Sequence, residues 1–217
     1  MPEDLTGRLR PLKCQLAYLE KADGSCSYSQ GDTTVWASCS GPGDVHISRR
    51  ENYKMSLDVS YRTPSGEGGH NKLNSLLRAA LESVVNTSLF PRTCLTVTIN
   101  VLEDLGSAKA VGITAAALAL LDNGAPSRSI FCGVNVVRVD GKLVLDPDRR
   151  VEQKADASFL FVLQLTETND VQLIGSQCLG SFQPAEYRQA QSLATEGSRQ
   201  IFDFFKQIIF RKLSVEA

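Results

Sequence analysis

The chain has 217 residues, of which 42% are hydrophobic and 22% are charged, and this length and composition predict one globular domain spanning residues 1–217. Such a composition excludes a chain whose working state is disordered. The 23 Lys and Arg residues face 24 Asp and Glu residues, so with a net charge of −1 any nucleic-acid surface has to be a local basic patch.

The N-terminal segment and the cysteine spacing indicate an intracellular protein. Residues 1–10 carry four charged side chains and no apolar run. The longest uncharged apolar stretch, residues 110–121, is shorter than the roughly 20 residues that a spanning helix needs, so we expect neither secretion nor a membrane span. The six cysteines lie at least twelve residues apart, which disfavours structural zinc and disulfide scaffolding and favours buried, reduced thiols.

In chain order, the first 90 residues alternate β-prone runs with turns. Three such runs predict a meander of short strands, at residues 15–19, 26–29 and 33–38. Residues 54–61 alternate apolar and polar side chains, which predicts a half-buried strand. Residues 63–69 are rich in Gly and Pro and predict a loop, and residues 71–88 have the apolar spacing of an amphipathic helix.

The second part of the chain repeats this alternation of strands and helices. A strand at 94–102 precedes a helix at 108–122, which is apolar almost all round and is therefore expected to lie buried between other layers. The remaining predicted elements are a hairpin of strands 130–139 and 142–145, a short charged helix 148–156, strands 159–165 and 171–176, and a long helix from Pro184. This order predicts a single domain of the α/β (α+β) class.

The turn at residues 104–107 is a candidate phosphate site because it ends a strand and opens a helix. The first N–H groups of a helix lack internal acceptors, and the positive end of the helix dipole attracts anions. Gly106 would let an anion approach the backbone closely. The alternative, which a single Gly-Ser pair favours by itself, is that Ser107 is simply the N-cap of the helix.

A second candidate is an acidic group that follows the predicted hairpin: Asp146, Asp148, Glu152 and Asp156. The last three would stack on one helix face at i, i+4 spacing. Carboxylates grouped in this way could hold Mg²⁺ or move a proton in phosphoryl transfer. Because Arg149, Arg150 and Lys154 interleave with them, solvated helix charges explain the run about as well.

A third candidate is a basic surface around the Gly-rich loop and the helix after it. Its residues are Arg49, Arg50, Lys54, Arg62, His70, Lys72 and Arg78. Presented together, they would bind a nucleic-acid backbone by neutralising phosphate charge, with little base preference. Scattered solubilising charge is an equally good explanation.

Short motifs spread over most of the chain carry a family resemblance in their order and spacing. They are Gly24-Ser25, Gly31-Asp32-Thr33-Thr34-Val35, Gly41-Pro42, Pro91-Arg92-Thr93, Asp104-Leu105-Gly106-Ser107, Leu121-Asp122-Asn123-Gly124-Ala125-Pro126, Asp140-Gly141 and Leu145-Asp146-Pro147. With these motifs the chain resembles the RNase PH family, and more narrowly the RNase PH-like ring subunits of the eukaryotic RNA exosome, of the bacterial RNase PH-like class. The resemblance implies mixed sheets flanked by helices, similar to the second domain of ribosomal protein S5.

The resemblance also implies a site that attacks the RNA 3′ end with inorganic phosphate. The phosphate loop of active members corresponds to Gly106-Ser107-Ala108-Lys109, where Lys109 replaces an arginine and lacks its bidentate geometry. Glu152 stands at the position of a catalytic aspartate, with Asp156 nearby. On the preceding helix Arg78 matches a basic position, whereas Asn74 replaces an RNA-binding arginine.

These departures imply an eroded site, because positioned cations stabilise the transition state of phosphoryl transfer. We therefore expect a structural, RNA-binding ring subunit that pairs with other RNase PH-like subunits in 3′–5′ RNA processing and degradation. It would work in the nucleus and nucleolus and also in the cytoplasm, and could form a homodimer outside the ring. The alternative is an active phosphate-dependent 3′–5′ exoribonuclease, or a metal-dependent nuclease using Mg²⁺, which could also bind or degrade DNA.

Overall fold

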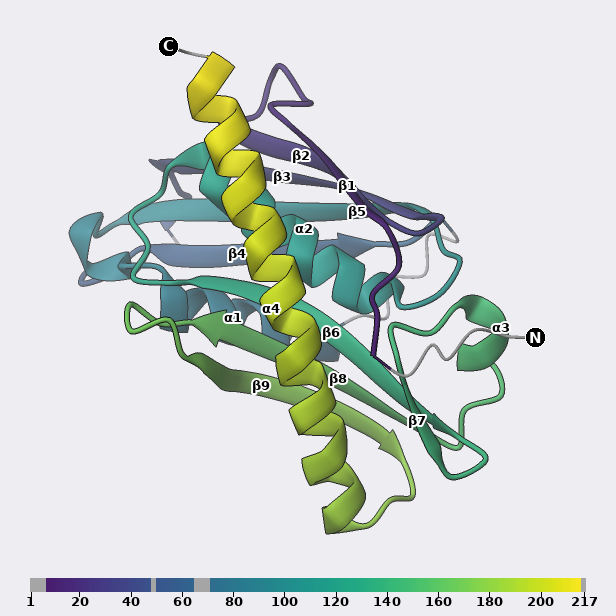
Figure 1. Ribbon diagram of the computed structural model, residues 1–217. Helices are drawn as coiled ribbons and strands as arrows, with labels where there is room; N and C mark the ends of the chain where they lie inside the picture. Colours follow the sequence, from purple (N-terminus) through teal and green to yellow (C-terminus); the bar gives the residue numbers. More distant parts are fainter. Residues whose placement is uncertain (1–6, 48–49, 65–70, 216–217) are drawn as a thin grey trace.

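The computed structural model describes residues 7–47, 50–64 and 71–215. Figure 1 shows its helices and strands coloured along the chain. In chain order these are β1 (Leu12–Leu16), β2 (Gly24–Gln30), β3 (Thr33–Asp44), β4 (Ser56–Arg62), α1 (Asn71–Val84), the 3₁₀ turn η2 (Thr87–Leu89), β5 (Thr93–Glu103), α2 (Ala108–Asn123), β6 (Ile130–Val139), β7 (Lys142–Leu145), α3 (Arg149–Glu152), β8 (Ala157–Leu165), β9 (Val171–Gly180) and α4 (Pro184–Val215).

The strands form two sheets. The first has the order β1-β2-β3-β5-β4, and the second has the order β7-β6-β8-β9. All neighbours are antiparallel except β4 and β5, which run parallel. A parallel pair needs a crossover connection, and α1 provides it between β4 and β5. The predicted mixed α/β class is therefore confirmed.

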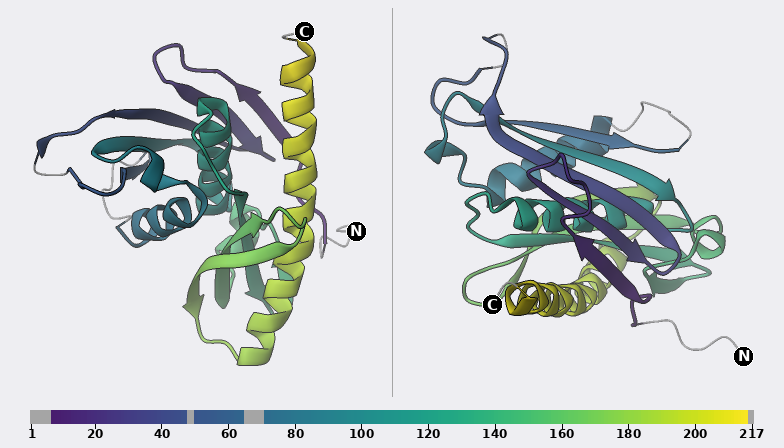
Figure 2. Two further views of the ribbon diagram at one scale, coloured as in Figure 1. Left: turned by 90° about the vertical axis from the view of Figure 1, so that its left-hand side faces the viewer. Right: turned by 90° about the horizontal axis from the view of Figure 1, so that it is seen from above.

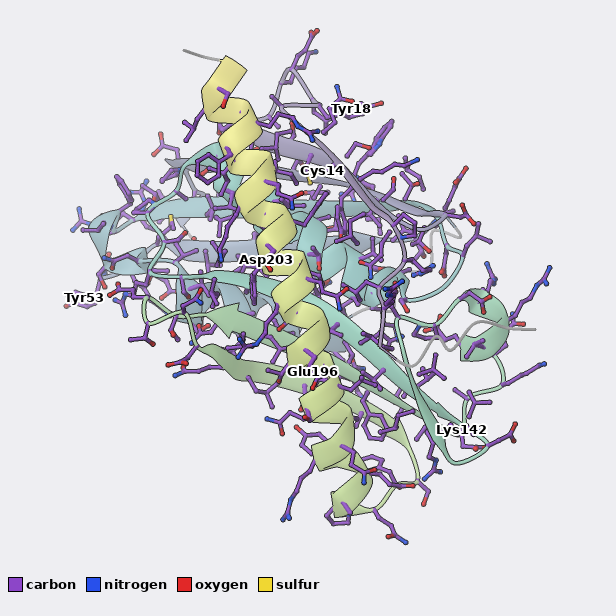
Figure 3. The ribbon with its side chains drawn as sticks, in the orientation of Figure 1. Cys14, Tyr18, Tyr53, Lys142, Glu196 and Asp203 are labelled. Carbon is purple, nitrogen blue, oxygen red and sulfur yellow. The ribbon has the colours of Figure 1, made fainter. Side chains whose placement is uncertain are left out.

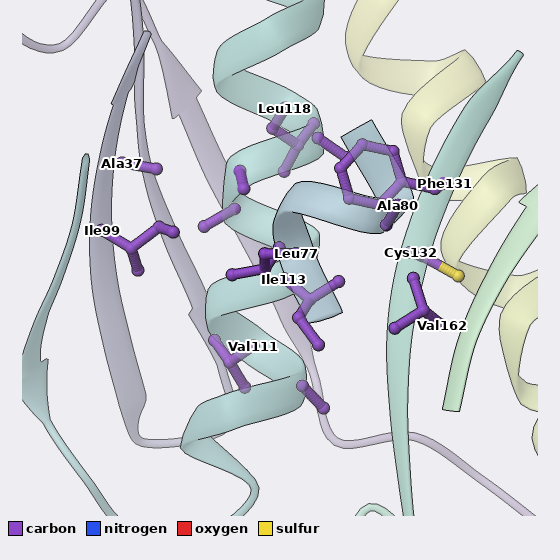
Figure 4. Packing of buried hydrophobic residues seen from close by; sticks show 14 of the residues in the cluster. Ala37, Leu77, Ala80, Ile99, Val111, Ile113, Leu118, Phe131, Cys132 and Val162 are labelled. Carbon is purple, nitrogen blue, oxygen red and sulfur yellow. The ribbon is translucent and has the colours of Figure 1, made fainter. Parts of the chain in front are cut away.

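Helix α2 lies between the two sheets (Figure 2), as its apolar sequence predicts. Residues 108 and 110–120 of this helix are all buried. Ala37 and Ile99 of the first sheet face α2 on one side, and Phe131 of the second sheet faces it on the other (Figure 4). At Gly133 a Cβ atom would lie 2.6 Å from the carbonyl oxygen of Ala110, so only glycine lets β6 come this close to the helix.

Helix α4 packs across the second sheet and continues past it toward the first (Figure 1). With 32 residues it is about 48 Å long at 1.5 Å per residue. Near its C-terminal end the Lys212 Nζ lies 2.8 Å from Asp122 Oδ1 of α2, and the ring of Phe204 lies 6.3 Å from that of Tyr28. One continuous apolar core therefore joins both sheets, α2 and α4.

Several predicted boundaries move once partner strands are present. The first strand is Leu12–Leu16, not 15–19, because it pairs residue by residue with β2 and ends before Ala17, whose φ is 52°. The predicted helix 71–88 ends at Val84, since the Asn86 N–H donates to the Pro126 carbonyl instead of continuing the helix. The predicted loop at 63–69 lies mostly outside the described residues.

The predicted helix 148–156 is wrong in length, because α3 covers only Arg149–Glu152. The side chain of Asp148 accepts a hydrogen bond from the Val151 N–H and caps the helix at its start. At the other end the Asp156 N–H donates to the Arg138 carbonyl at 2.9 Å and so joins the second sheet. Asp156 is therefore not on the helix face with Glu152, and the predicted stack of three carboxylates does not form.

The thiols differ in their burial. Cys26, Cys39 and Cys132 are buried, whereas Cys14, Cys94 and Cys178 are half-buried.

Within the described ranges, no helix has both the length and the apolar character that crossing a membrane requires.

Candidate functional site

Two turns far apart in the sequence meet beside the start of α2. One is the turn 104–107 between β5 and α2, and the other is the segment 146–149 after β7. The Arg149 N–H donates to the Leu105 carbonyl at 2.9 Å, and Arg149 Nη1 donates to the Asp104 carbonyl at 2.8 Å. The two segments that the sequence singles out for phosphate binding and for acid chemistry therefore form one site.

Gly106 is required here for the packing of the two turns. Its φ is 112°, and a Cβ atom would lie 2.5 Å from the backbone nitrogen of Arg149 and 2.6 Å from the Pro147 carbonyl oxygen. The space that glycine leaves open is thus filled by residues 147–149 of the chain itself. The predicted approach of an anion over Gly106 has no room from this side.

The backbone N–H of Ser107 already has an anionic partner. It donates to Glu152 Oε2 at 3.0 Å. Ser107 is the N-cap of α2 with φ 56°, so this carboxylate lies at the positive end of the helix dipole. Glu152 therefore occupies the position at which the resemblance implies a bound phosphate.

The Ser107 hydroxyl also has hydrogen-bond partners within the chain. Ser107 is 1% exposed, and its Oγ donates to the Pro147 carbonyl at 3.0 Å. Asn135 Nδ2 donates to Ser107 Oγ at 3.3 Å and to Glu152 Oε1 at 3.4 Å. Ser158 Oγ in turn donates to Asn135 Oδ1 at 3.3 Å. The carboxylate and the hydroxyl are held by one connected set of hydrogen bonds.

A small hollow of about 20 Å³ borders this set on the side of the second sheet. Its lining residues are Lys109, Asn135, Glu152, Ser158, Leu160, Gln177 and Leu179. The buried Oε1 atom of Gln177 has no hydrogen-bond donor among the described residues. A hollow of this size holds about one water molecule. Lys109, the exposed replacement for the family's arginine, and Glu152 therefore both line a space that is too small for phosphate.

Asp146 has a partner that the sequence did not reveal. Its carboxylate accepts from Arg10 Nε at 3.0 Å, from Arg10 Nη2 at 2.7 Å and from the Arg10 backbone N–H at 3.0 Å. Arg10 Nη2 also donates to the Gly106 carbonyl at 3.0 Å. The Asp146 side chain is 2% exposed, so this pair ties the N-terminal segment to both turns.

The predicted metal ligands do not come together with a third donor. Asp156 is exposed, and the described part of the chain contains no group of three or more His, Cys, Asp or Glu side chains that could hold a metal ion. Both carboxylate oxygens of Glu152 accept hydrogen bonds from N–H donors. These donors stabilise the negative charge of the carboxylate and occupy the oxygens that a cation would need. The residues present therefore do not fit a Mg²⁺ ion bound through Glu152 and Asp156.

The predicted nucleic-acid residues that the structure describes come from β4 and α1. Lys72 and Arg78 are exposed on α1, Arg62 is exposed at the end of β4, and His70 is outside the described residues. Arg78 borders a hollow of about 780 Å³ whose lining also carries four carboxylates, Asp44, Glu51, Asp58 and Glu82. The surroundings of Arg78 are thus more acidic than the sequence window suggests.

Asn74, which replaces an arginine of the family, has a structural role. Its Oδ1 accepts a hydrogen bond from the Tyr61 N–H at 3.1 Å. This contact fixes α1 against β4 at the point where β4 has no further strand beside it. At the position where active members of the family place an RNA-binding arginine, this chain therefore has a side chain that binds its own backbone.

The sequence patterns did not predict two residues of the site, Arg10 and Asn135. Arg10 lies 136 residues from Asp146, and nothing local marks it among the other N-terminal charges. Asn135 could have been found, because it is the one polar side chain in the apolar run 130–137 and a buried amide needs partners. A polar residue inside a continuous apolar strand is the pattern that points to such a site.

The comparisons with known proteins agree over nearly the whole chain. Residues 8–126 match domain 1 of the 3′ exoribonuclease family, RNase PH, and residues 129–197 match domain 2. The exosome complex component RRP46 homolog of Caenorhabditis elegans is 41% identical over 212 residues, covering 98% of this chain and 99% of that protein. The exosome complex component Rrp41 of Archaeoglobus fulgidus is 30% identical and covers 94% of this chain and 83% of its own.

Solved structures support the same assignment. Rice (Oryza sativa) Rrp46 superposes with a TM-score of 0.85 at 25% identity, covering 92% of this chain and 94% of that one. Cell-death-related nuclease 5 of C. elegans superposes with a TM-score of 0.72 at 34% identity, covering 96% and 100%. The predicted RNase PH-like fold is confirmed, and the chain belongs to the RNase PH family of 3′ exoribonucleases.

Proposed function

We propose that this protein is an RNase PH-like ring subunit of an exosome and acts in 3′–5′ RNA processing and degradation beside other subunits of its family. The observation that carries the proposal is the end-to-end match with a protein named as an exosome component, which covers 98% of one chain and 99% of the other. A match of this extent leaves little of either chain for a different architecture.

Within such a ring, the subunit contributes structure and RNA contacts. Phosphorolysis needs inorganic phosphate as co-substrate at the start of α2, where Glu152 already binds the Ser107 N–H. The arginine expected in this loop is replaced by Lys109, which presents a point charge in place of a bidentate fork. These two features support a site that no longer carries out the family reaction by itself.

Purification of the tagged protein from the cells that express it tests the assignment to the ring. Mass spectrometry should identify several other RNase PH-like subunits at stoichiometric amounts after a high-salt wash. A tagged unrelated protein of similar size serves as control. Recovery of the chain alone, or with no family member, would contradict the proposal.

RNA binding has its own test, with Lys72→Ala and Arg78→Ala on α1. Each should weaken single-stranded RNA binding and reduce its salt dependence, because phosphate contacts release counterions. Lys142→Ala is the matched control, since this exposed lysine lies in the β6–β7 hairpin, far from α1 (Figure 3). Equal affinity in all three variants would place RNA elsewhere on the surface.

A second candidate function is nuclease activity outside the ring, which could extend to DNA. It is favoured by the similarity to cell-death-related nuclease 5, which spans 96% of this chain. Labelled RNA and DNA incubated with the pure protein, with and without phosphate and Mg²⁺, separate the possibilities. Nucleoside diphosphates would indicate phosphorolysis, monophosphates would indicate hydrolysis, and unchanged substrate would support the scaffold role.

Oligomeric state and location belong to the same proposal. A ring subunit isolated from its neighbours exposes their contact surfaces, so a homodimer is expected, and sedimentation of the pure protein measures it. We propose that the protein works in the nucleus and nucleolus and also in the cytoplasm. Fluorescence of the tagged chain at its natural expression level checks this distribution.

A further inference from the structure

We propose that Glu152 is the residue that excludes inorganic phosphate, because its carboxylate serves as a built-in anion at the start of α2. This inference concerns the same site as the proposed function and rests on that site's assignment as the family's anion site. It does not depend on membership of a ring, since it describes what the isolated chain binds.

The contacts of Glu152 are those of a bound anion. Its Oε2 accepts from the Ser107 N–H at 3.0 Å, and its Oε1 lies 3.4 Å from Asn135 Nδ2. Lys109 borders the same hollow. A backbone N–H and a side-chain amide on one carboxylate, with a lysine in the lining of the same hollow, are donor types that also suit a bound phosphate.

The position of Glu152 argues against an ordinary helix cap. A capping acid usually comes from the N-cap or from the third residue of the same helix. Glu152 reaches the N-cap of α2 from the last residue of α3, 45 positions along the chain. Helix α3 has its own cap, Asp148, and is held to the turn by the bond from the Arg149 N–H to the Leu105 carbonyl. The short helix therefore delivers the carboxylate to a second helix.

Side-chain length explains why a glutamate can do this. The resemblance places an aspartate at position 152 in active members, and glutamate is longer by one methylene. A tethered carboxylate competes with a free anion at an effective concentration on the order of millimolar or more. Its negative charge also repels phosphate at short range. This repulsion persists even when the hydrogen bond between Glu152 and the Ser107 N–H is open.

The hollow beside Glu152 also contains an amide oxygen without a donor among the described residues. Gln177 Oε1 is buried beside Glu152 and lacks a donor among the described residues. A buried acceptor without a donor costs free energy, and a water molecule in the hollow or the Lys109 ammonium would supply that donor. Lys109 supplies the cationic side chain in the lining of this hollow.

Phosphate binding by two variants tests the inference. Glu152→Ala should bind inorganic phosphate saturably, seen as a rise in Tm with phosphate over chloride at equal ionic strength and as ³¹P line broadening. Glu152→Asp withdraws the carboxylate by one methylene and should bind more weakly than Glu152→Ala but more tightly than wild type. It also keeps the test usable where the alanine variant fails to fold.

Glu103→Ala is the matched control, because it removes an exposed carboxylate at the end of β5 beside the same turn. It should bind no more phosphate than wild type, which separates the loss of local charge from the opening of the site. If the role of Glu152 were purely structural, its replacement would lower Tm by the same amount in chloride and in phosphate. Folded Glu152→Ala and Glu152→Asp variants that bind no phosphate, or a wild type that binds it as tightly as they do, would overturn the inference. Ring membership would remain separately testable by purification.

Discussion

Arg10 and Asp146 form a buried ion pair between segments that lie 136 residues apart in the sequence. Arg10 Nη2 is 2.7 Å from Asp146 Oδ1, and Arg10 Nε is 3.0 Å from Asp146 Oδ2. The side chains are 16% and 2% exposed. Because Arg10 also donates to the Gly106 carbonyl, this pair supports the turn that presents Ser107.

Removing Arg10 should destabilise the fold, because it leaves the Asp146 carboxylate buried without its cation. We expect Arg10→Ala to lower the free energy of unfolding by about 3 kcal/mol in urea denaturation. Arg8→Ala removes a nearby exposed arginine and should change it by less than about 0.5 kcal/mol. The double variant Arg10→Ala, Asp146→Ala should recover part of the loss, and a strictly additive double variant would contradict the pairing.

Gly106→Ala should separate the two turns of the site. The new Cβ would lie 2.5 Å from the Arg149 nitrogen at a φ of 112°, so strain and overpacking together should cost about 3 kcal/mol. Gly43→Ala is the control, because no heavy atom lies within 4 Å of a Cβ atom at that position. Thermal unfolding compares the two, and a tolerated Gly106→Ala would mean that residues 147–149 move aside.

Glu186 should make stability depend on acid pH. The Gln183 N–H and then the Arg138 guanidinium lower the pKa of this carboxyl at the start of α4. A lowered folded-state pKa gives stability above the unfolded pKa, and that stability is lost as pH falls through the folded value. Glu186→Gln should therefore lower Tm at pH 7, and its difference from wild type should shrink as acid protonates the native carboxyl.

The control for this acid dependence is Glu196→Gln on the same helix (Figure 3), where the glutamate is exposed. Its Tm should follow that of wild type at every pH. A Glu186→Gln variant whose deficit stays constant down to the acid transition would show that the contribution comes from packing alone.

The thiols should react in two classes. Burial raises the pKa of Cys39 to about 12 and that of Cys132 further, and the pKa of Cys26 is raised by its hydrogen bond with Cys14 and by burial. Because the thiolate is the reactive form, these three should resist a thiol reagent at pH 8 in the native protein. The half-buried Cys14, Cys94 and Cys178 should label first, and denaturant should expose all six.

Peptide mapping after a short pulse of the reagent identifies which cysteines have reacted. Figure 3 shows Cys14 on β1, the edge strand of the first sheet, where its side chain is half-buried. Cys132 has no exposed surface and lies on β6 of the second sheet. Rapid labelling of Cys132 in the native protein would contradict its burial.

Local periodicity predicted most elements because it depends on neighbours in the chain. The helix predicted at 108–122 is Ala108–Asn123, and the hairpin at 130–139 and 142–145 matches β6 and β7 residue for residue. Errors concentrate where a distant backbone group takes over a hydrogen bond. The helix predicted to reach Asp156 stops at Glu152 because the Asp156 N–H pairs with Arg138 in a strand.

By itself, the sequence determined where most helices and strands lie and that α2 is buried, and it marked the turn at Ser107 and the region of Glu152 as candidate sites. The tertiary structure alone decided what these groups bind. Glu152 reaches the Ser107 N–H, and Arg10 holds Asp146, only because two sheets pack on α2 and bring their turns to one end of it. Contacts between residues 45 and 136 positions apart depend on this packing, which no local spacing encodes.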